Sequence, residues 1–399
     1  MNTKEYIEKA EETLLHTYNR YPVVFEKGEG VYLYDTDGNK YLDFASGIGV
    51  MGLGYGNKEY TDALKDQAVK LLHTSNLFYS DVTASAAMRV TRASGMDRVF
   101  FTNSGTEAVE GAIKAAKKYA YDKDGTTDHE IIAFNSSFHG RSLGALSVTG
   151  KESYRAPFEG LIPGIRFADF NDISSVRALV NEKTCAVIVE VVQGEGGIHK
   201  ASREFMEGLE ALRREHGLLL VFDEIQCGMG RTGKMFAYQH YNVKPDIVTM
   251  AKALGCGVPV GCFALTEDVA AHSLVPGDHG STYGGNPFVL RAVDKALEIM
   301  EREDVPGHAH EAAQYLTGEL DKLKNKYNFI EEIRGLGLMA GIKLSDTLKA
   351  GDIVNDARDE GLIIITAEEN VLRLLPPLII QKEDVDKAVS VLDKVFSLK

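Results

Sequence analysis

Two stretches decide the fold. Residues Leu218-Leu219-Leu220-Val221-Phe222-Asp223-Glu224 run apolar for five positions and then end in acids, which is typical of a buried strand that delivers a carboxylate at its C-terminal end. Residues 247–252 repeat the construction and end in Lys252. The acid and the amine are 252 − 223 = 29 residues apart, about one strand-crossover-strand unit. We therefore expect Asp223 and Lys252 on neighbouring or near-neighbouring strands, at one edge of a sheet.

The pattern outside these stretches predicts an α/β protein with a mostly parallel sheet covered by helices. Further strands are expected at 99–101, 131–134, 186–192 and 262–265, with a helix at 107–119. Residues 31–34 and 40–44 read as an antiparallel hairpin. After Pro287 come amphipathic helices at 289–303 and 312–327, short strands near 338–344 and 362–366, and a final helix.

This organisation predicts three segments. Residues 1–55 belong to a smaller domain, residues 56–287 form a large domain, and residues 288–399 form a C-terminal α+β part. We expect the C-terminal part to share its sheet with the N-terminal hairpin.

The composition and net charge of the chain limit the classes of molecule that it is expected to bind. The chain has 399 residues and a formal net charge of −14, which argues against nucleic acid or an anionic membrane as a partner. Its four cysteines have no metal-ligand spacing and suit a reducing compartment, so no metal site is expected. No apolar stretch reaches the roughly 18 residues of a spanning helix. The sequence predicts a soluble, cytoplasmic protein.

Two alternatives compete with an enzyme site built on Asp223 and Lys252. Gly228, Gly230 and Gly233 fit the G-x-G-x-x-G pattern of NAD-dependent dehydrogenases, but that pattern should open a helix directly after its strand, and here Asp223 to Cys227 intervene. A non-enzymatic interaction protein has no support, because no repeat, heptad or basic face is present.

Three motifs carry a resemblance to a known family. The chain resembles the class III aminotransferases, which are fold type I enzymes dependent on pyridoxal phosphate. The motifs are Asp223-Glu224-Ile225-Gln226, Gly230-Arg231-Thr232-Gly233 and Lys252-Ala253-Leu254-Gly255. The resemblance covers nearly the whole chain and implies a seven-stranded, mostly parallel sheet in the large domain. It also implies a homodimer with shared active sites.

The resemblance assigns the cofactor residues. It implies that Lys252 forms the Schiff base with pyridoxal phosphate, that Asp223 pairs with the pyridine nitrogen, and that Gln226 lies near the ring hydroxyl. A carboxylate favours the protonated ring, which is the better electron sink, and a desolvated lysine is more often neutral and nucleophilic. Phe138 is expected to cover one face of the ring.

The phosphate is expected at a helix start. Ser104, Gly105 and Thr106 lie between a predicted strand and a predicted helix, where backbone N–H groups bind anions. From this segment alone, simple capping of the helix by Ser104 is an equally good reading. The resemblance favours the phosphate, and it implies that Thr282 reaches the phosphate of the partner subunit.

The resemblance also assigns substrate contacts. Arg141 is implied as a carboxylate clamp, Ser281 joins the substrate-binding set, and Glu195 with Arg373 is implied as a gate. Glutamate carries two carboxylates and needs both Arg141 and Arg373. An ω-amine donor carries only one carboxylate, so Glu195 is expected to pair with Arg373 in the half-reaction of that donor.

Within the family, four strings are most similar to acetylornithine aminotransferases. They are at 73–77, 230–234, 278–287 and 334–339. The implied reaction, part of arginine biosynthesis, converts N-acetylornithine and 2-oxoglutarate to N-acetylglutamate 5-semialdehyde and glutamate. Ornithine, succinylornithine and 4-aminobutyrate are the alternative donors. The chain departs from the family at Val191, at 54–58 (usually Gly-His-x-His-Pro) and at Cys256 (usually Gly).

Overall fold

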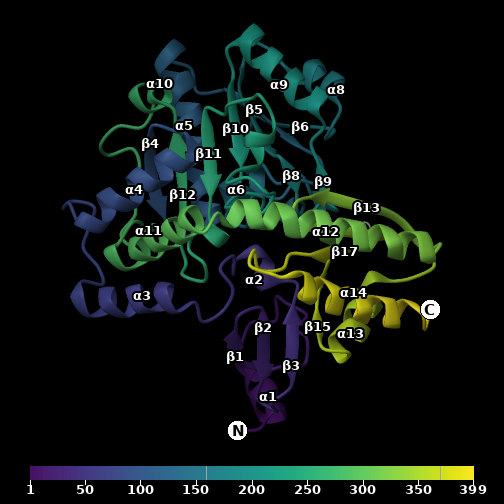
Figure 1. Ribbon diagram of the computed structural model, residues 1–399. Coiled ribbons are helices and arrows are strands. Elements are labelled where there is room, and N and C mark those ends of the chain that lie inside the picture. The colour runs from purple at the N-terminus through teal and green to yellow at the C-terminus, as the bar shows by residue number, and fades with distance from the viewer. Residues whose placement is uncertain (159, 369) are drawn as a thin grey trace.

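A seven-stranded sheet forms the centre of the computed structural model, which describes residues 1–158, 160–368 and 370–399 (Figure 1). β10 lies between β7 and β11 and is parallel to both, and β5 is parallel to β7 and β6. Only β12 runs antiparallel to its neighbours β11 and β4. The mostly parallel sheet expected from the sequence is therefore confirmed. In spatial order the strands are β4 (Arg98–Thr102), β12 (Gly261–Leu265), β11 (Ile247–Met250), β10 (Leu219–Asp223), β7 (Thr184–Glu190), β5 (Glu130–Phe134) and β6 (Ile165–Ala168).

Helices cover both faces of this sheet because its central strands are apolar on both sides. Leu219 and Val221 of β10 pack in one core cluster with the apolar side of α5 (Gly105–Asp124). Leu220 and Phe222 alternate to the other face, into the cluster that contains α9 (Arg203–His216). The remaining helices of this region are α3 (Lys58–Lys70), α4 (Asp81–Ser94), α6 (Leu143–Ser147), α7 (Glu152–Arg155), α8 (Ile173–Leu179) and α10 (Glu267–Ala271).

Both ends of the chain build the smaller sheets. The expected hairpin is present as β2 and β3, which are antiparallel, and β15 adds to it parallel to β3. The C-terminal part therefore extends the N-terminal sheet, as expected. The order is β1 (Phe25–Glu29), β2 (Tyr32–Asp35), β3 (Lys40–Asp43) and β15 (Leu362–Ile363), and a second sheet has the order β13 (Ile330–Leu336), β14 (Met339–Leu344), β17 (Val371–Leu374) and β16 (Ile365–Ala367).

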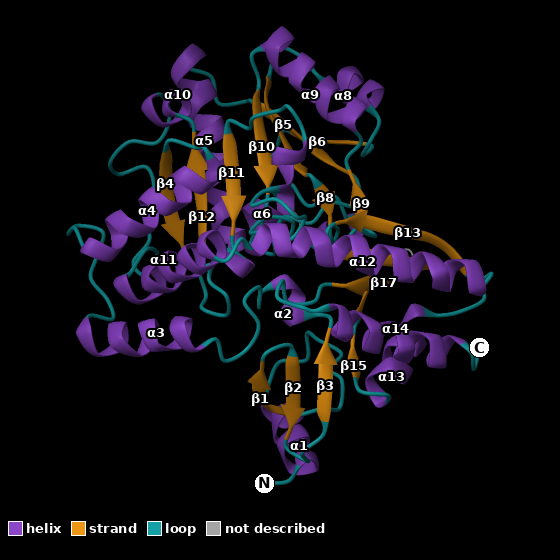
Figure 2. Cartoon of the chain, in the orientation of Figure 1, coloured by secondary structure: helices purple, strands orange, loops and turns teal. Residues whose placement is uncertain are grey.

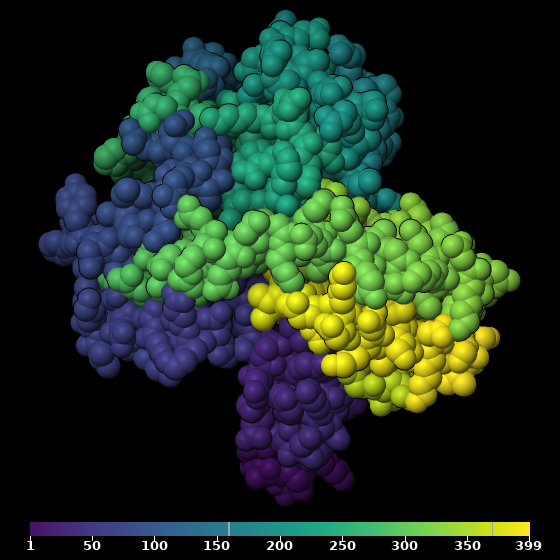
Figure 3. Space-filling view, in the orientation of Figure 1, coloured from purple at the N-terminus to yellow at the C-terminus, as the bar shows by residue number. Residues whose placement is uncertain are grey.

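Long helices lie between the large sheet and these small sheets. α11 and α12 cross the middle of the molecule, and α13 and α14 pack beside the C-terminal strands (Figure 2). The N-terminal strands form a lobe that projects from the rest of the molecule (Figure 3). The elements not yet bounded are α1 (Thr3–Thr13), α2 (Ser46–Gly49), α11 (Pro287–Arg302), α12 (Val305–Lys326), α13 (Ala350–Asp359), α14 (Lys382–Phe396), β8 (Val192–Gln193), β9 (His199–Lys200) and the 3₁₀ turns Ala237–His240 and Lys252–Leu254.

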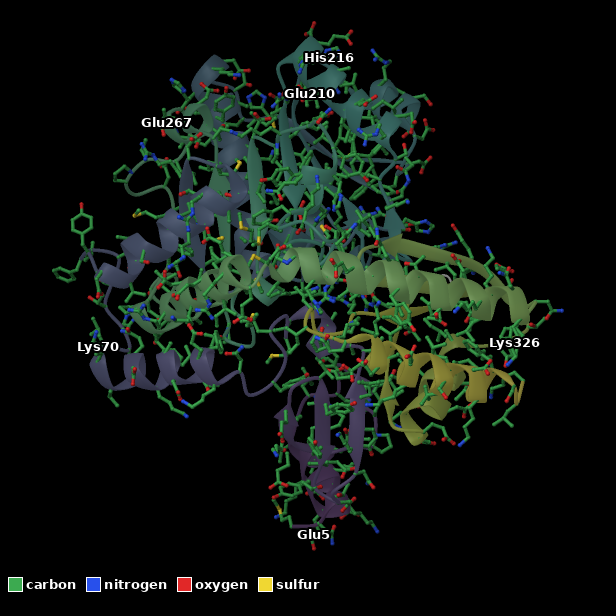
Figure 4. The ribbon with its side chains drawn as sticks, viewed as in Figure 1. Glu5, Lys70, Glu210, His216, Glu267 and Lys326 are labelled. Carbon is green, nitrogen blue, oxygen red and sulfur yellow. The ribbon has the colours of Figure 1, made fainter. Side chains whose placement is uncertain are left out.

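Glu5 of α1 and Lys326 of α12 are examples of charged side chains on the outside of the molecule (Figure 4). The four cysteines are free and buried. None of the helices in the described chain combines the length and apolarity that a membrane span requires. Nor do His, Cys, Asp and Glu side chains within the described ranges gather into a group of three that could hold a metal ion.

Candidate active site

A cavity of about 520 Å³ opens at the C-terminal ends of the central strands. In Figure 2 the arrowheads of β10 and β11 point toward α2, and Val50, directly after α2, is part of the cavity wall. The lining residues are Val50, Asn103, Ser104, Gly105, Thr106, Phe138, His139, Gly140, Arg141, Glu190, Asp223, Ile225, Gln226, Ala251, Lys252, Gly257, Val258, Pro259 and Val260. A hollow of about 590 Å³ on α4 is larger, but its Arg89 and Arg92 are already paired with acids of α11.

Asp223 and Lys252 reach this cavity from adjacent parallel strands. Asp223 ends β10 opposite Thr249 of β11, and Lys252 follows β11 in a 3₁₀ turn. The Lys252 amine is buried, and this burial lowers its pKa to about 8. A larger fraction of the amine is therefore neutral near pH 8 than for a lysine in water.

Asp223 has a buried partner that sequence reasoning left out of the catalytic set. Its Oδ2 lies 2.7 Å from Nδ1 of His139. Burial opposes the charged imidazolium, but the hydrogen bond and charge of Asp223 outweigh it, and the pKa of His139 is raised. Nε2 of His139 is buried without a hydrogen-bond partner. The signal for His139 was its place in the loop after β5, beside Phe138 and Arg141.

Glu190 is a second acid at this edge. It ends β7 in register with Asp223 of β10. Its carboxylate accepts hydrogen bonds from the backbone N–H groups of Phe138 (2.9 Å) and Gly194 (3.0 Å). Burial raises the pKa of Glu190 to about 7. Glu190 therefore joins the loop of Phe138 to the loop that carries Glu195.

The start of α5 lines the cavity through Ser104, Gly105 and Thr106. Ser104 caps the helix, since its Oγ accepts a hydrogen bond from the Glu107 N–H at 3.3 Å. A Cβ on Gly105 would lie 2.9 Å from Cδ1 of Ile225, so this turn sits close to the Asp223 loop. The N-terminus of a 20-residue helix that opens into a cavity favours an anion there. Capping and anion binding are thus compatible.

Arg141 and Phe138 form the wall after β5. The guanidinium of Arg141 stacks on the ring of Tyr154 at 3.8 Å and lies 5.4 Å from the Phe138 ring centroid. Arg141 itself is exposed at the cavity mouth. Stacking on Tyr154 uses the face of the guanidinium and leaves its N–H edge available to a carboxylate.

Glu195 and Arg373 form the ion pair expected from the sequence. Nη1 of Arg373 lies 2.6 Å from Oε1 of Glu195, and Nη2 lies 3.3 Å from Oε2. Burial would raise the pKa of Glu195, but Arg373 outweighs it and the pKa is lowered. Nη1 of Arg373 is also 3.4 Å from Oε1 of Gln226, which lines the cavity. The pair stands directly behind the cavity wall.

Ser281 and Thr282 lie in a turn beside the α5 entrance. Oγ of Ser281 accepts a hydrogen bond from Nδ2 of Asn103 at 3.1 Å, whereas Thr282 is exposed. The glycines 228, 230 and 233 lie in consecutive turns, and the short 3₁₀ turn that follows begins only at Ala237. The helix that a dinucleotide fingerprint requires does not open at these glycines.

Comparisons with known proteins agree on one family. The family model described as aminotransferase class-III matches residues 14–396. The acetylornithine aminotransferase of Methanocaldococcus jannaschii is 44% identical over 397 residues, with 100% of this chain and 99% of that protein covered. The acetylornithine aminotransferase of Aquifex aeolicus is 46% identical over 385 residues, with coverage of 96% and 99%.

Solved structures share the fold over the full chain. The ornithine aminotransferase from Toxoplasma gondii superposes with a TM-score of 0.95 at 31% identity and covers 100% of this chain and 96% of that one. The acetylornithine aminotransferase from Elizabethkingia anophelis gives a TM-score of 0.88 at 30% identity, with 100% of both chains covered. A second structure of the Toxoplasma enzyme is described with partial occupancy of PLP at its active site.

Proposed function

This chain belongs to the class-III aminotransferases, and we propose that it transfers the side-chain amino group of N-acetylornithine to 2-oxoglutarate. The products are N-acetylglutamate 5-semialdehyde and glutamate, in arginine biosynthesis. The observation that carries the proposal is the identity of 44% to 46% to acetylornithine aminotransferases over nearly the whole length.

The cofactor of this family is pyridoxal phosphate, and the cavity fits it. Pyridoxal phosphate has a flat ring with a basic nitrogen, an aldehyde and a phosphate. The cavity offers a carboxylate at Asp223, a buried amine with a pKa of about 8 at Lys252, and the N-terminus of α5. Its volume of about 520 Å³ is in the usual range for small-ligand sites.

Besides Lys252, we assign contacts with the cofactor to seven residues. Asp223 holds a proton on the ring nitrogen, and Gln226 lies near the ring hydroxyl. Phe138 covers one ring face and excludes water from it. Ser104, Gly105 and Thr106 bind the phosphate, together with Thr282 of a second subunit. The His139 contact at 2.7 Å orients the Asp223 carboxylate.

Lys252 performs the proton transfers in this proposal. When bound, the cofactor provides an aldehyde for the amino group and a ring that accepts the electron pair of the reacting carbon. The Lys252 amine would hold the cofactor and, when free, would take the proton from the reacting carbon of the substrate and deliver it to the carbon of the cofactor aldehyde. Its lowered pKa suits both tasks, because a neutral amine can accept a proton near neutral pH.

The ion pair of Glu195 and Arg373 supports the use of two unlike substrates. With N-acetylornithine, no carboxylate lies beside the reacting carbon, so Arg373 stays paired with Glu195 while Arg141 binds the distant carboxylate. With glutamate or 2-oxoglutarate, a carboxylate lies beside that carbon, and Glu195 moves aside to free Arg373. Ser281, next to the α5 entrance, completes the substrate-binding set.

A homodimer with shared active sites is part of the proposal. Leu77, Phe78 and Tyr79 are apolar or aromatic and strongly exposed, at 88%, 70% and 105%. They adjoin the turn of Thr282, since Asn76 Nδ2 donates to the carbonyls of Ser281 and Gly284. A second copy covering this surface would bury it and bring Thr282 to the partner's cofactor. The buried free cysteines are in keeping with a cytoplasmic location.

Single-turnover absorbance tests the substrate. The enzyme loaded with pyridoxal phosphate is mixed with N-acetylornithine, N-succinylornithine, ornithine or 4-aminobutyrate, without a keto acid, and the loss of the lysine-bound absorbance is followed. N-acetylornithine should react with the highest kcat/KM. If it is not among the two best donors, the substrate assignment is wrong while the aminotransferase class stands.

A further inference from the structure

The turn that carries Lys252 has an unfavourable backbone conformation. Lys252 and Cys256 have φ angles of +48° and +43°, in the left-handed region that side-chain-bearing residues rarely occupy. Such conformations persist where the surrounding structure holds them. The contacts that hold this turn therefore determine where the Lys252 amine lies.

Gly255 is the point at which the turn is held. Its N–H donates to the Lys252 carbonyl at 3.1 Å, which closes the 3₁₀ turn. Its own carbonyl accepts two hydrogen bonds, from the Val258 N–H at 3.0 Å and from the Tyr60 hydroxyl at 2.5 Å. A Cβ on Gly255 would lie 2.1 Å from the Val258 carbonyl oxygen, so the turn has no room to shift there.

Tyr60 comes from a distant part of the chain and is itself fixed. It is buried in the first turn of α3, where the Asn57 side chain accepts its backbone N–H at 3.0 Å. The neighbouring segment also packs on the turn, because a Cβ on Gly52 would lie 3.4 Å from Cβ of Ala253, and one on Gly257 would lie 3.0 Å from Sδ of Met51. α3 and the segment before it thus support the turn from outside the cavity.

We propose that Tyr60 is a positioning residue for Lys252, whose hydroxyl fixes the Lys252 turn through the Gly255 carbonyl. The inference rests on the proposed role of Lys252 as the amine that binds the cofactor. Tyr60 does not line the cavity, so its effect passes through the backbone of the turn. The departures from the family at 54–58 and at Cys256 lie on the two sides of this contact.

The expected consequence concerns the basicity of Lys252. The groups that face its amine are Glu195, Arg373, Asp223 and Glu190, and burial is the main cause of its lowered pKa. A turn that is no longer held lets water reach the amine, and its pKa then rises toward the ordinary value of 10.5. A smaller neutral fraction at neutral pH slows attack on the cofactor aldehyde.

The test compares Tyr60→Phe with a matched control, Tyr238→Phe. Tyr238 is equally buried, at 6% exposure against 7%, and its hydroxyl also donates to a backbone carbonyl, that of Ser94, away from the cavity. The second-order rate of pyridoxal phosphate capture by each apoenzyme is measured against pH, alongside urea unfolding. For Tyr60→Phe we expect the apparent pKa of capture to rise by about one unit, which slows capture at pH 7.5 by about tenfold.

Equal capture profiles for the two variants would overturn the proposal and leave Tyr60 with a structural role only. If Tyr60→Phe does not fold, Asn57→Ala removes the contact that places Tyr60 and should shift the profile in the same direction by a smaller amount; an unchanged profile there would also overturn it. Failure of the proposed function is visible separately, since wild-type apoenzyme would then capture no pyridoxal phosphate at Lys252.

Discussion

At the residue scale, Arg373 and Arg141 differ in the contacts that their guanidinium groups make before substrate binds. Arg373 is 3% exposed and forms two hydrogen bonds with Glu195, whereas Arg141 is exposed and stacks on Tyr154. In the proposed mechanism, replacing Arg373 removes a carboxylate clamp that becomes free only when Glu195 leaves. In the same mechanism, replacing Arg141 removes a clamp that is available throughout the reaction.

We expect Arg373→Ala to impair the glutamate and 2-oxoglutarate half-reaction more than the N-acetylornithine half-reaction. Arg141→Ala should impair both. A lost charge-assisted contact of about 1.5 to 3 kcal/mol corresponds to about a 10-fold to 150-fold loss in kcat/KM. Each half-reaction is measured alone by single-turnover absorbance.

The double variant Arg373→Ala with Glu195→Ala serves as a control, because the single variant leaves the Glu195 carboxylate without its main partner. If the loss with glutamate disappears in the double variant, the unpaired Glu195 caused it, and Arg373 is not a clamp. If Arg373→Ala affects both half-reactions equally, Glu195 and Arg373 do not form a substrate-dependent gate.

The ionisable groups of the site differ in how far sequence predicts them. Asp223 and Lys252 were placed together because each directly follows an apolar run, and runs of that kind end at one sheet edge. His139 and Glu190 were not given their roles. Which buried acid meets which histidine depends on the spacing of β5, β7 and β10 in the sheet, and no local pattern in the sequence encodes that spacing.

At the scale of elements, helix α5 packs tightly on the sheet at Gly111. A Cβ on Gly111 would lie 2.2 Å from Cε1 of Phe263 in β12. Phe263 is buried and stacked with Phe100, at 5.4 Å between ring centroids, so its ring has little freedom to move. The close approach of α5 to β12 thus depends on the missing side chain.

We expect Gly111→Ala to lower the free energy of unfolding by about 1 to 3 kcal/mol through overpacking, despite the better helix propensity of alanine. Gly318→Ala in α12 is the matched control. Gly318 is exposed with open space around its Cβ direction, so the same change there should add about 0.5 to 1 kcal/mol. Urea unfolding of both apoenzymes measures the difference, and equal shifts would refute the packing argument.

The elements found from sequence were those with strong apolar patterns. Strands β5, β10, β11 and β12 and helices α5 and α11 lie where the patterns placed them, within about five residues, whereas α12 begins at Val305, seven residues before its predicted start at 312. β13 and β17 were not predicted. β13 has the sequence Ile-Glu-Glu-Ile-Arg-Gly-Leu with a single buried residue, and Arg373 interrupts the apolar residues of β17, so neither has the continuous apolar run that identifies a strand in the large sheet.

At the scale of the whole molecule, we propose that residues 56–287 form a large domain and that residues 1–55 and 288–399 form the smaller one. The pairing of β3 with β15 links the two ends of the chain. Arg373 is on β17 of the smaller part, whereas Lys252 and Asp223 are on the large sheet. Under this division, residues of both domains would contribute to the proposed gate and the proposed chemistry.

The last prediction concerns the proposed dimer and uses two defective variants. Lys252→Ala should bind pyridoxal phosphate without a covalent link and lose transamination. Thr282→Ala should lose at least about tenfold in activity, because in the proposed site it removes a hydrogen bond to a charged phosphate. If Thr282 serves the partner's cofactor, a mixed dimer has one site with both residues intact and one site with neither. Random reassociation makes about half of the dimers mixed, so about a quarter of wild-type activity should return after subunit exchange.

If Thr282 serves its own subunit, every site in the mixture lacks one residue, and activity stays at the average of the two parents. Sedimentation of the mixture provides the independent check, since an active monomer would contradict the shared site itself.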